Sequence, residues 1–273
     1  GVMLAEVCQT LHTLAKDREE FFLICDAKRG DITETQIPYY RAYLSDLGAD
    51  AFPKGCGQFG FDAMTVTTWM GEDVLTPGLP FFRRGKGAIV VTRSSNPSGT
   101  TLQDAVVRAN SSIELTGKQE PFRLTKDVID AVTVLIERPP TAHEVMLYQT
   151  ERFSEMYGLN QHGVGPIFSV IGATVMMDKT FRKIRPNGIA LIPGFGAQGG
   201  EFKNVMPLVV KEGSLAGHLG ILSSSRAHNF PWLKKYGGSG SPALVEDEVR
   251  RAIDAFRTHE KRSYQEAGYD YPF

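Results

Sequence analysis

The chain has 273 residues, and its hydrophobic fraction of 42% is sufficient for a buried core in one large domain or two small ones. Lysine and arginine number 30 against 31 aspartates and glutamates, which gives a formal net charge of −1. This balance excludes a broad basic surface for nucleic acid or an anionic membrane, so an anionic ligand must be held by a local site.

The three cysteines, Cys8, Cys25 and Cys56, have neither metal-ligand spacing nor a secretory disulfide pattern. We therefore expect a reducing compartment. No apolar run approaches the length of a membrane span, and no signal peptide is visible. Because the chain begins at Gly1 inside a helical pattern, we expect it to be a piece of a longer polypeptide.

Apolar spacing along the chain predicts alternating helices and strands. Strands are expected at 21–26, 62–69, 87–93, 166–173, 188–194 and 219–225. Helices are expected at 2–18 and 33–47, around Val106, at 128–136, 145–157 and 176–184, and at 242–260. The stretch 71–86 predicts a short helix or irregular turn, 101–165 a helical elaboration, and 260–273 a tail or linker.

The six predicted strands are apolar throughout and alternate with helices, which is typical of a parallel sheet buried on both faces. A doubly wound sheet and a TIM-type barrel both fit this α/β pattern, and we expect residues 1–273 to form one domain. In either fold, ligands bind at the carboxyl ends of the strands. Polar, charged or glycine-rich segments follow the strands here: DAKRGD, TTWMG, TRSSNPSG, GAT, PGFGAQGG and SSSRAHNF.

The last two strand ends favour a phosphate site. Gly194, Gly196 and Gly199 form a G-x-G-x-x-G pattern, which is weak evidence for a dinucleotide because it comes late in the chain. A tight turn is the alternative. Glycine N–H groups and the Gln198 amide can surround an anion, and Arg226 can bind a phosphate in a bidentate manner. Arg226 alone is equally consistent with a surface ion pair.

The segment DAKRGD follows the first predicted strand. Asp26 and Lys28 are two residues apart and share one face of an extended chain. They fit a structural ion pair or a site with a Schiff-base lysine. Because flanking carboxylates stabilise an ammonium ion, a fixed cation or proton donor is favoured over an amine nucleophile.

These segments resemble the orotidine 5′-monophosphate decarboxylase family. ICDAKRGDI is similar to its D-x-K-x-x-D-I motif, and SSNP, IPGFGAQGG and the Ser-Arg pair after the last strand extend the likeness over about residues 1–260. The order and spacing are those of the longer form of the enzyme. The first motif alone is shared with sister phosphosugar enzymes, whereas the four together are specific.

The resemblance implies a (β/α)₈ barrel that works as a homodimer without a metal or organic cofactor. Asp26 would lie beside the substrate carboxylate and Lys28 would protonate the pyrimidine carbon after decarboxylation. Asp31 would reach into the partner's site, with Ile32 and Thr35 beside it. The implied substrate-binding residues are Ile32, Thr35, Ser95, Asn96, Pro193, Gln198, Gly199, Ser225 and Arg226.

The chain departs from the family at its start. Two strands should precede DAKRGD and carry a ribose-binding Asp and a second catalytic Lys, so we expect the first two strands to be missing. The segment alone is then expected to be unstable or inactive. The resemblance also allows fusion to orotate phosphoribosyltransferase, and it implies a cytoplasmic enzyme, or one in a peroxisome-like organelle if fused.

Two other functions remain open. One is a Mg²⁺-dependent decarboxylase or aldolase of keto-sugar phosphates from a sister barrel family. The other is a non-catalytic nucleotide-binding subunit, against which Asp26, Lys28 and Asp31 argue.

Overall fold

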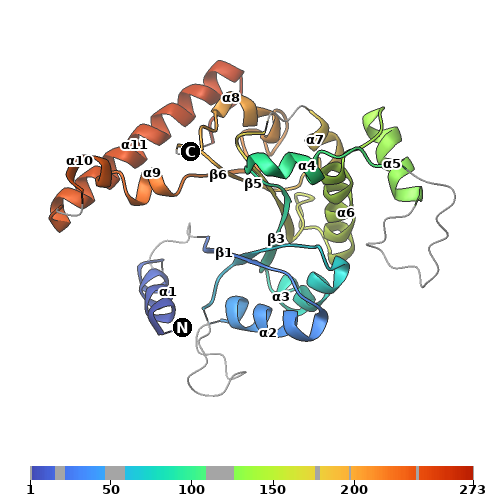
Figure 1. The fold of residues 1–273 in the computed structure, drawn as a ribbon, viewed down its shortest axis with the longest axis horizontal. Helices are drawn as coiled ribbons and strands as arrows, with labels where there is room; N and C mark the ends of the chain where they lie inside the picture. The colour runs from blue at the N-terminus through green and yellow to red at the C-terminus, as the bar shows by residue number, and fades with distance from the viewer. Residues whose placement is uncertain are drawn as a thin grey trace.

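A computed structural model describes residues 2–15, 22–46, 59–108, 126–175, 179–196, 198–237 and 240–272. Six parallel strands form one sheet in the order β1-β2-β3-β4-β5-β6. They are β1 Ile24–Arg29, β2 Ala63–Val66, β3 Gly87–Arg93, β4 Ile167–Ile171, β5 Ala190–Pro193 and β6 Gly220–Ser223. Because the strand order never reverses, the sheet is part of a barrel wall and not a doubly wound sheet (Figure 1).

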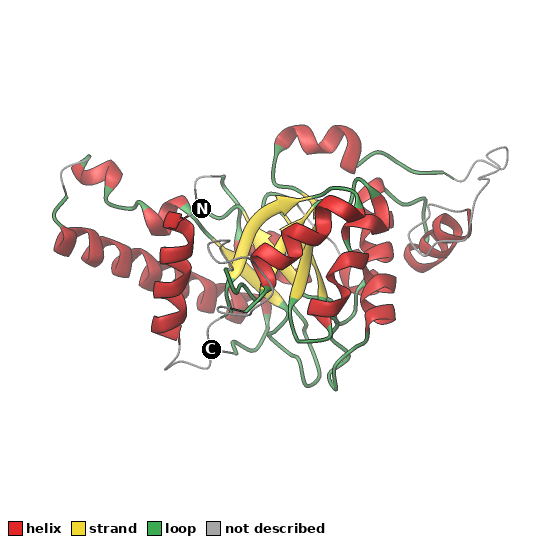
Figure 2. Ribbon diagram, turned by 90° about the horizontal axis from the view of Figure 1, so that it is seen from below, coloured by secondary structure: helices red, strands yellow, loops and turns green. Residues whose placement is uncertain are grey.

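Helices surround the outside of the curved sheet (Figure 2). The longer ones are α1 Val2–Ala15, α2 Thr33–Leu44, α5 Lys126–Ile136, α6 Ala142–Tyr157 and α11 Pro242–Ala267. The shorter ones are α3 Leu79–Phe82, α4 Thr100–Gln103, α7 Thr180–Ile184, α8 Phe202–Val205, α9 Arg226–Asn229 and α10 Leu233–Tyr236, and 3-10 turns occupy Gly71–Val74, Thr76–Gly78, Pro97–Gly99 and Met206–Leu208. Within the described ranges, no helix has the length and apolar character that a membrane crossing requires.

The two faces of the sheet pack into different cores. On the concave face, Ala63, Ile89, Phe168, Val170 and Leu191 form one buried cluster. The alternate residues of the same strands pack outward against the helices in two larger clusters. This two-sided burial is the reason that the strands are apolar throughout.

The first strand differs from its prediction. It begins at Ile24 and continues to Arg29, so the charged residues belong to the strand itself and do not follow it. The extension occurs because Arg29 still pairs with Val66 of β2. The helix expected around Val106 is also wrong, because Val106 forms an antiparallel bridge with Thr141.

The predicted tail at 260–273 needs a larger correction. Helix α11 continues to Ala267, and the Tyr264 side chain is fully buried. Tyr269 and Tyr271 pack against the same core. These aromatic side chains bury apolar area that a solvated tail would leave exposed. The predicted helix at 176–184 is described only in part, since residues 176–178 lie outside the described ranges.

Two arginines, the buried Arg185 and the partly buried Arg182, hold the amino-terminal ends of β4, β5 and β6 together. Arg185 is ion-paired with Glu151 at 2.7 Å and donates to Ser169 Oγ and the Ile167 carbonyl. Arg182 donates to the backbone carbonyls of Arg185, Pro186, Gly188, Leu208 and Leu219. Burial lowers the pKa of Arg182 to about 9, so the side chain is charged at neutral pH. The end of the sheet opposite the predicted site is thereby closed by polar contacts.

Candidate active site

A bulge in β1 carries the predicted Asp-Lys pair. Cys25 pairs with Met64 and Arg29 pairs with Val66, so residues 26–28 all lie opposite Thr65. The Lys28 backbone has φ of 46°, the left-handed region that non-glycine residues seldom adopt. The bulge thus sets both charged side chains around one residue of β2.

The two charged groups are in direct contact. Lys28 Nζ lies 2.5 Å from both carboxylate oxygens of Asp26. Thr65 Oγ1 donates to Asp26 Oδ1 and accepts the Lys28 backbone N–H, each over 2.9 Å. The Lys28 and Asp26 side chains are 54% and 65% exposed, and an exposed pair of this kind contributes about 0–1 kcal/mol to stability. Fold stability alone therefore gives little reason for the bulge.

Arg29 points away from this pair. It donates to the Tyr43 hydroxyl over 2.9 Å and lies over the Tyr39 ring, on the helix side of the sheet. The next residue, Gly30, has room for no side chain, because a Cβ there would lie 2.3 Å from the Thr67 carbonyl oxygen. The strand therefore separates Lys28 from Arg29 and turns sharply toward α2.

The predicted dimer residues lie in this turn and in the first turn of α2. Asp31 Oδ1 accepts the Ile32 backbone N–H over 2.8 Å, and the Ile32 carbonyl accepts the Thr35 N–H. Ile32 is 50% exposed despite its apolar side chain. Its exposure beside a charged residue is compatible with a contact to another molecule.

A cavity of about 510 Å³ lies at the carboxyl ends of β3, β4 and β5. It brings together the predicted Ser95, Asn96 and Gln198, which come from two different strand ends. The other lining residues are Arg93, Pro97, Thr100, Thr174 and Val175. Hydroxyl and amide groups over a cavity of this size suit a small polar ring.

The loop that carries Ser95 is held in place by residues that were not predicted from the sequence to be site residues. The buried Arg93 binds Asp104 through two hydrogen bonds of 2.8 and 2.9 Å, and it donates to the Ser94 carbonyl. Gln103 Oε1 accepts the Ser94 N–H over 2.9 Å. Burial lowers the pKa of His143, which is 2.9 Å from the Gln103 carbonyl, so it is neutral at pH 7.

The glycine-rich loop meets the last strand end. Gly194, Gly196 and Gly199 all have positive φ, which folds the loop back so that the Gly200 N–H reaches the Gly194 carbonyl. A Cβ at Gly196 would lie 3.0 Å from the Ala227 Cβ, so the loop lies against the start of α9.

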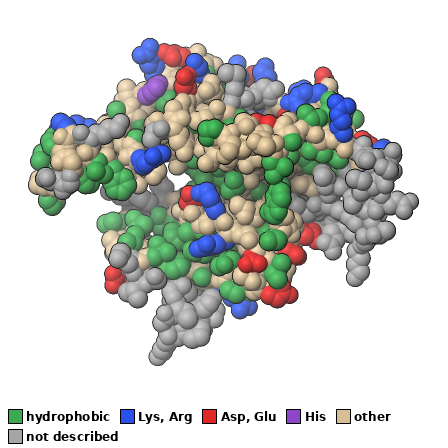
Figure 3. Space-filling view, viewed as in Figure 1, with side chains coloured by type: hydrophobic (Ala, Val, Ile, Leu, Met, Phe, Trp, Pro, Cys, Tyr) green, Lys and Arg blue, Asp and Glu red, His purple; other side chains and the backbone are tan. Residues whose placement is uncertain are grey.

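The predicted phosphate residues come from these two segments. Gln198 and Gly199 are exposed on the loop, and Ser225 and Arg226 are exposed beside it, while Pro193 ends β5. All the predicted residues therefore lie along the carboxyl edge of one sheet. The space-filling view shows acidic and basic side chains next to apolar ones in a hollow of this molecule (Figure 3).

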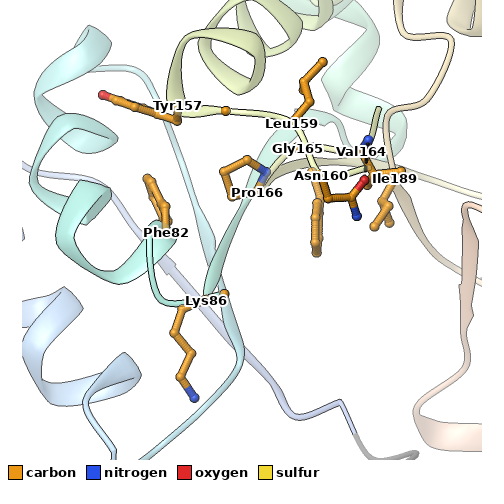
Figure 4. Close-up of a pocket in the computed structure, with 12 residues that line it drawn as sticks. Phe82, Lys86, Tyr157, Leu159, Asn160, Val164, Gly165, Pro166 and Ile189 are labelled. Atoms are coloured by element: carbon orange, nitrogen blue, oxygen red, sulfur yellow. Dashed lines mark hydrogen bonds between the residues drawn. The ribbon is translucent and has the colours of Figure 1, made fainter. Parts of the chain in front are cut away.

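A second cavity, of about 440 Å³, lies near the opposite ends of β3 and β4 (Figure 4). Its walls are mainly apolar, with Phe82, Tyr157 and Leu159 among them. Its one lysine, Lys86, is ion-paired with Asp46 and Asp62. The cavity contains none of the predicted site residues. In the part of the chain that the structure describes, no three His, Cys, Asp or Glu side chains are arranged to hold a metal, and Cys56 lies outside that part.

Comparison with known proteins gives a consistent set of relatives. A sequence model of the orotidine 5′-phosphate decarboxylase / HUMPS family matches residues 2–120. An orotidine 5′-phosphate decarboxylase from Rhodopirellula baltica is 32% identical over 233 residues, which is 84% of this chain and 64% of that protein. One from Caldicellulosiruptor bescii is 26% identical over 254 residues, 90% of this chain and 71% of the relative. The chain thus spans about two thirds of the length of these curated relatives.

Solved structures share the fold. A protein described as an orotidine-monophosphate decarboxylase from Toxoplasma gondii matches with a TM-score of 0.62 and 20% identity, covering 97% of this chain and 74% of its own. The UMP synthase of Leishmania donovani matches with a TM-score of 0.59 and 20% identity, covering 96% of this chain and 42% of its own.

Proposed function

We propose that the chain belongs to the orotidine 5′-phosphate decarboxylase / HUMPS family, and that the protein carrying it converts orotidine 5′-monophosphate to uridine 5′-monophosphate and CO₂. The observation that carries the proposal is the Asp26–Lys28 pair on the β1 bulge. It lies at the same sheet edge as the cavity lined by Ser95, Asn96 and Gln198.

The charged pair would perform the chemistry. The bond between the pyrimidine carbon and its carboxylate breaks, CO₂ leaves, and the electron pair stays on the ring carbon. The Lys28 ammonium stabilises this charge and transfers a proton from Nζ to the carbon. Asp26 holds the ammonium in position, and the stabilisation grows when the bound substrate excludes water from the site.

The remaining residues would bind the two ends of the substrate. Ser95 and Asn96 hydrogen-bond the pyrimidine. Gln198, Gly199, Ser225 and Arg226 hold the phosphate, with Pro193 beside them. Because the phosphate is distant from the reacting carbon, its binding energy can drive closure of the glycine-rich loop over the site.

We further infer a closed (β/α)₈ barrel in a homodimer. Among the described residues, β1 and β6 each pair on one side only, which leaves two edges for two more strands. Those strands would carry a second lysine and a ribose-binding aspartate. Asp31 and Thr35, with the exposed Ile32, would reach the partner subunit's site. The likeness in fold to a UMP synthase supports fusion to a phosphoribosyltransferase. The family resemblance, and not this match, is the basis for a cytoplasmic or peroxisome-like setting.

The test is a spectrophotometric decarboxylation assay with orotidine 5′-monophosphate and excess chelator, on the longest natural chain that contains this sequence. We expect turnover that resists the chelator and falls by at least about 1,000-fold in Lys28→Ala, because a preorganised charge is lost. Lys126→Ala is the matched control, since Lys126 forms an exposed pair with Asp130 at 2.9 Å, far from the site.

Each other outcome has a definite meaning. Loss of turnover with chelator would favour the Mg²⁺-dependent sugar-phosphate enzymes. A folded parent that binds uridine nucleotides without turnover would favour a binding subunit. An equal loss of turnover in Lys126→Ala would show that the effect of Lys28→Ala is not specific to Lys28.

A further inference from the structure

We propose that the Thr65 hydroxyl is the positioning group that sets the geometry of the Asp26–Lys28 pair, an inference that rests on the decarboxylase function above. Thr65 lies in the middle of β2 on the concave face, and it is 1% exposed. Its hydroxyl contacts both charged residues. We therefore expect it to act on the reaction through these two residues and not by contact with the substrate.

The Thr65 hydroxyl acts both as a hydrogen-bond donor and as a hydrogen-bond acceptor. It donates its one hydrogen to Asp26 Oδ1 and accepts the Lys28 backbone N–H, each at 2.9 Å. The second bond replaces a ladder bond, because three residues of β1 lie opposite one residue of β2. One side-chain oxygen thus fixes the Asp26 carboxylate and the Lys28 backbone together.

The Lys28 backbone needs such support. Its φ of 46° is unfavourable for an L-residue with a side chain. The ladder resumes immediately afterwards, where the Thr67 N–H reaches the Arg29 carbonyl over 2.8 Å. The Thr65 hydroxyl therefore holds one side of the strained residue, and the resumed ladder holds the other.

The contact between Asp26 and Lys28 is not sufficient to fix the positions of the two side chains. Both side chains are more than half exposed, and long exposed side chains sample several arrangements. Threonine, in contrast, has a restricted χ1, so a buried strand threonine aims its hydroxyl in one direction. Because Thr65 belongs to the hydrogen-bonded strand β2, its hydroxyl sets the direction in which the exposed pair is held.

Thr92 provides a matched comparison. It is also a buried strand threonine, 3% exposed, and its hydroxyl donates to the Val170 carbonyl over 2.7 Å. It has no hydrogen bond with either member of the charged pair. A purely structural role for a buried hydroxyl would make the two threonines equivalent.

The test compares Thr65→Val, Thr65→Ser and Thr92→Val in the full natural chain, with kcat and KM for orotidine 5′-monophosphate. We expect Thr65→Val to lower kcat about 100-fold with little change in KM, since small misplacement of catalytic groups has effects of that size. Thr65→Ser keeps the hydroxyl and should recover most of kcat. Thr92→Val should keep the parent kcat.

The proposal is overturned if folded Thr65→Val keeps the parent kcat, or if Thr92→Val loses as much. It is also overturned if Thr65→Ser is no better than Thr65→Val. If Thr65→Val does not fold, the comparison of Thr65→Ser and Thr65→Ala against Thr92→Val decides the same question.

A crystal structure of Thr65→Val separates this proposal from the proposed function. We expect the Asp26–Lys28 contact to change and Lys28 to leave its positive φ. An unchanged pair contradicts the positioning role. Absence of decarboxylation in the parent contradicts the function alone, because the structural comparison needs no turnover.

Discussion

Glu144 is a nearly buried carboxylate at the start of α6 that is surrounded by hydrogen-bond donors. Arg138 donates to its two oxygens over 2.6 and 2.9 Å, and the Thr141 N–H and hydroxyl donate over 2.8 and 2.9 Å. Burial alone would raise the pKa of Glu144, but the bonds from Arg138 and Thr141 outweigh it, so the pKa lies below its usual value. The bond from the Thr141 N–H to the Glu144 carboxylate is also one half of the capping box of the helix.

The sign of this shift fixes a pH dependence. Because the pKa of Glu144 is lower in the folded than in the unfolded chain, the carboxylate stabilises the fold above the unfolded value of about 4.3. The contribution is lost as the pH falls below that value. We expect Glu144→Gln to lower the free energy of unfolding by about 1–3 kcal/mol at pH 7. The difference from the parent should shrink below about pH 4.

Urea unfolding at pH 7, 5, 4 and 3 measures this effect. Glu246→Gln is the control, since Glu246 forms an exposed i,i+4 pair with Arg250 in α11. A Glu144→Gln penalty that is the same at every pH would assign the residue to packing and not to charge.

At the scale of elements, α4 holds the loop of the proposed pyrimidine site. Asp104 follows α4 and pairs with Arg93, whose third contact is the Ser94 carbonyl next to Ser95. We expect Asp104→Asn to weaken this clamp and raise KM about tenfold with a smaller change in kcat, because loss of one charge-assisted bond is worth about that factor.

Steady-state kinetics of Asp104→Asn against Asp127→Asn would check the clamp. Asp127 is an acidic residue in the first turn of α5, and it is not part of the Arg93 network. A kcat loss without a KM change would place the effect on the chemical step and contradict a role in holding the loop.

The elements were largely predictable, whereas the contacts between them were not. Apolar runs gave all six strands, and spacing gave α5 and α6 closely. The β1 bulge depends on which β2 residues lie opposite Asp26 and Lys28, and the alternation of one strand contains no such information. In the sequence, Thr65 cannot be distinguished from other β-branched strand residues. The pairing of Asp104 with Arg93 depends on the tertiary structure, which local sequence patterns do not predict.

The carboxyl-terminal segment shows the same limit of prediction from sequence. The polar composition after residue 260 predicted a tail, but it contains three tyrosines whose burial depends on the neighbouring core. Ser95 and Asn96 were predicted through family resemblance, and Gln198 was predicted from the glycine-rich loop as well. The cavity that all three line gives these predicted residues a common location.

At the scale of the whole molecule, the open sheet is the main feature. β1 and β6 each have one unpaired edge among the described residues, and such edges pair readily with other chains. We expect the 273-residue chain alone to be unstable or inactive and to self-associate with rising concentration. Light scattering after size exclusion, together with the decarboxylation assay, tests this. A monodisperse chain with full activity would contradict it.

The hydrogen bonds that Arg182 makes at the amino-terminal ends of the strands affect which sequence changes this protein can accept. Arg182 binds main-chain carbonyls, and every amino acid supplies that acceptor. Substitutions at Pro186, Gly188 or Leu219 change side chains but leave the acceptor atoms in the chain. The guanidinium itself has no such substitute, because lysine lacks its planar array of donors. Over generations, the loops at this end can therefore drift in sequence around a single position that must remain arginine.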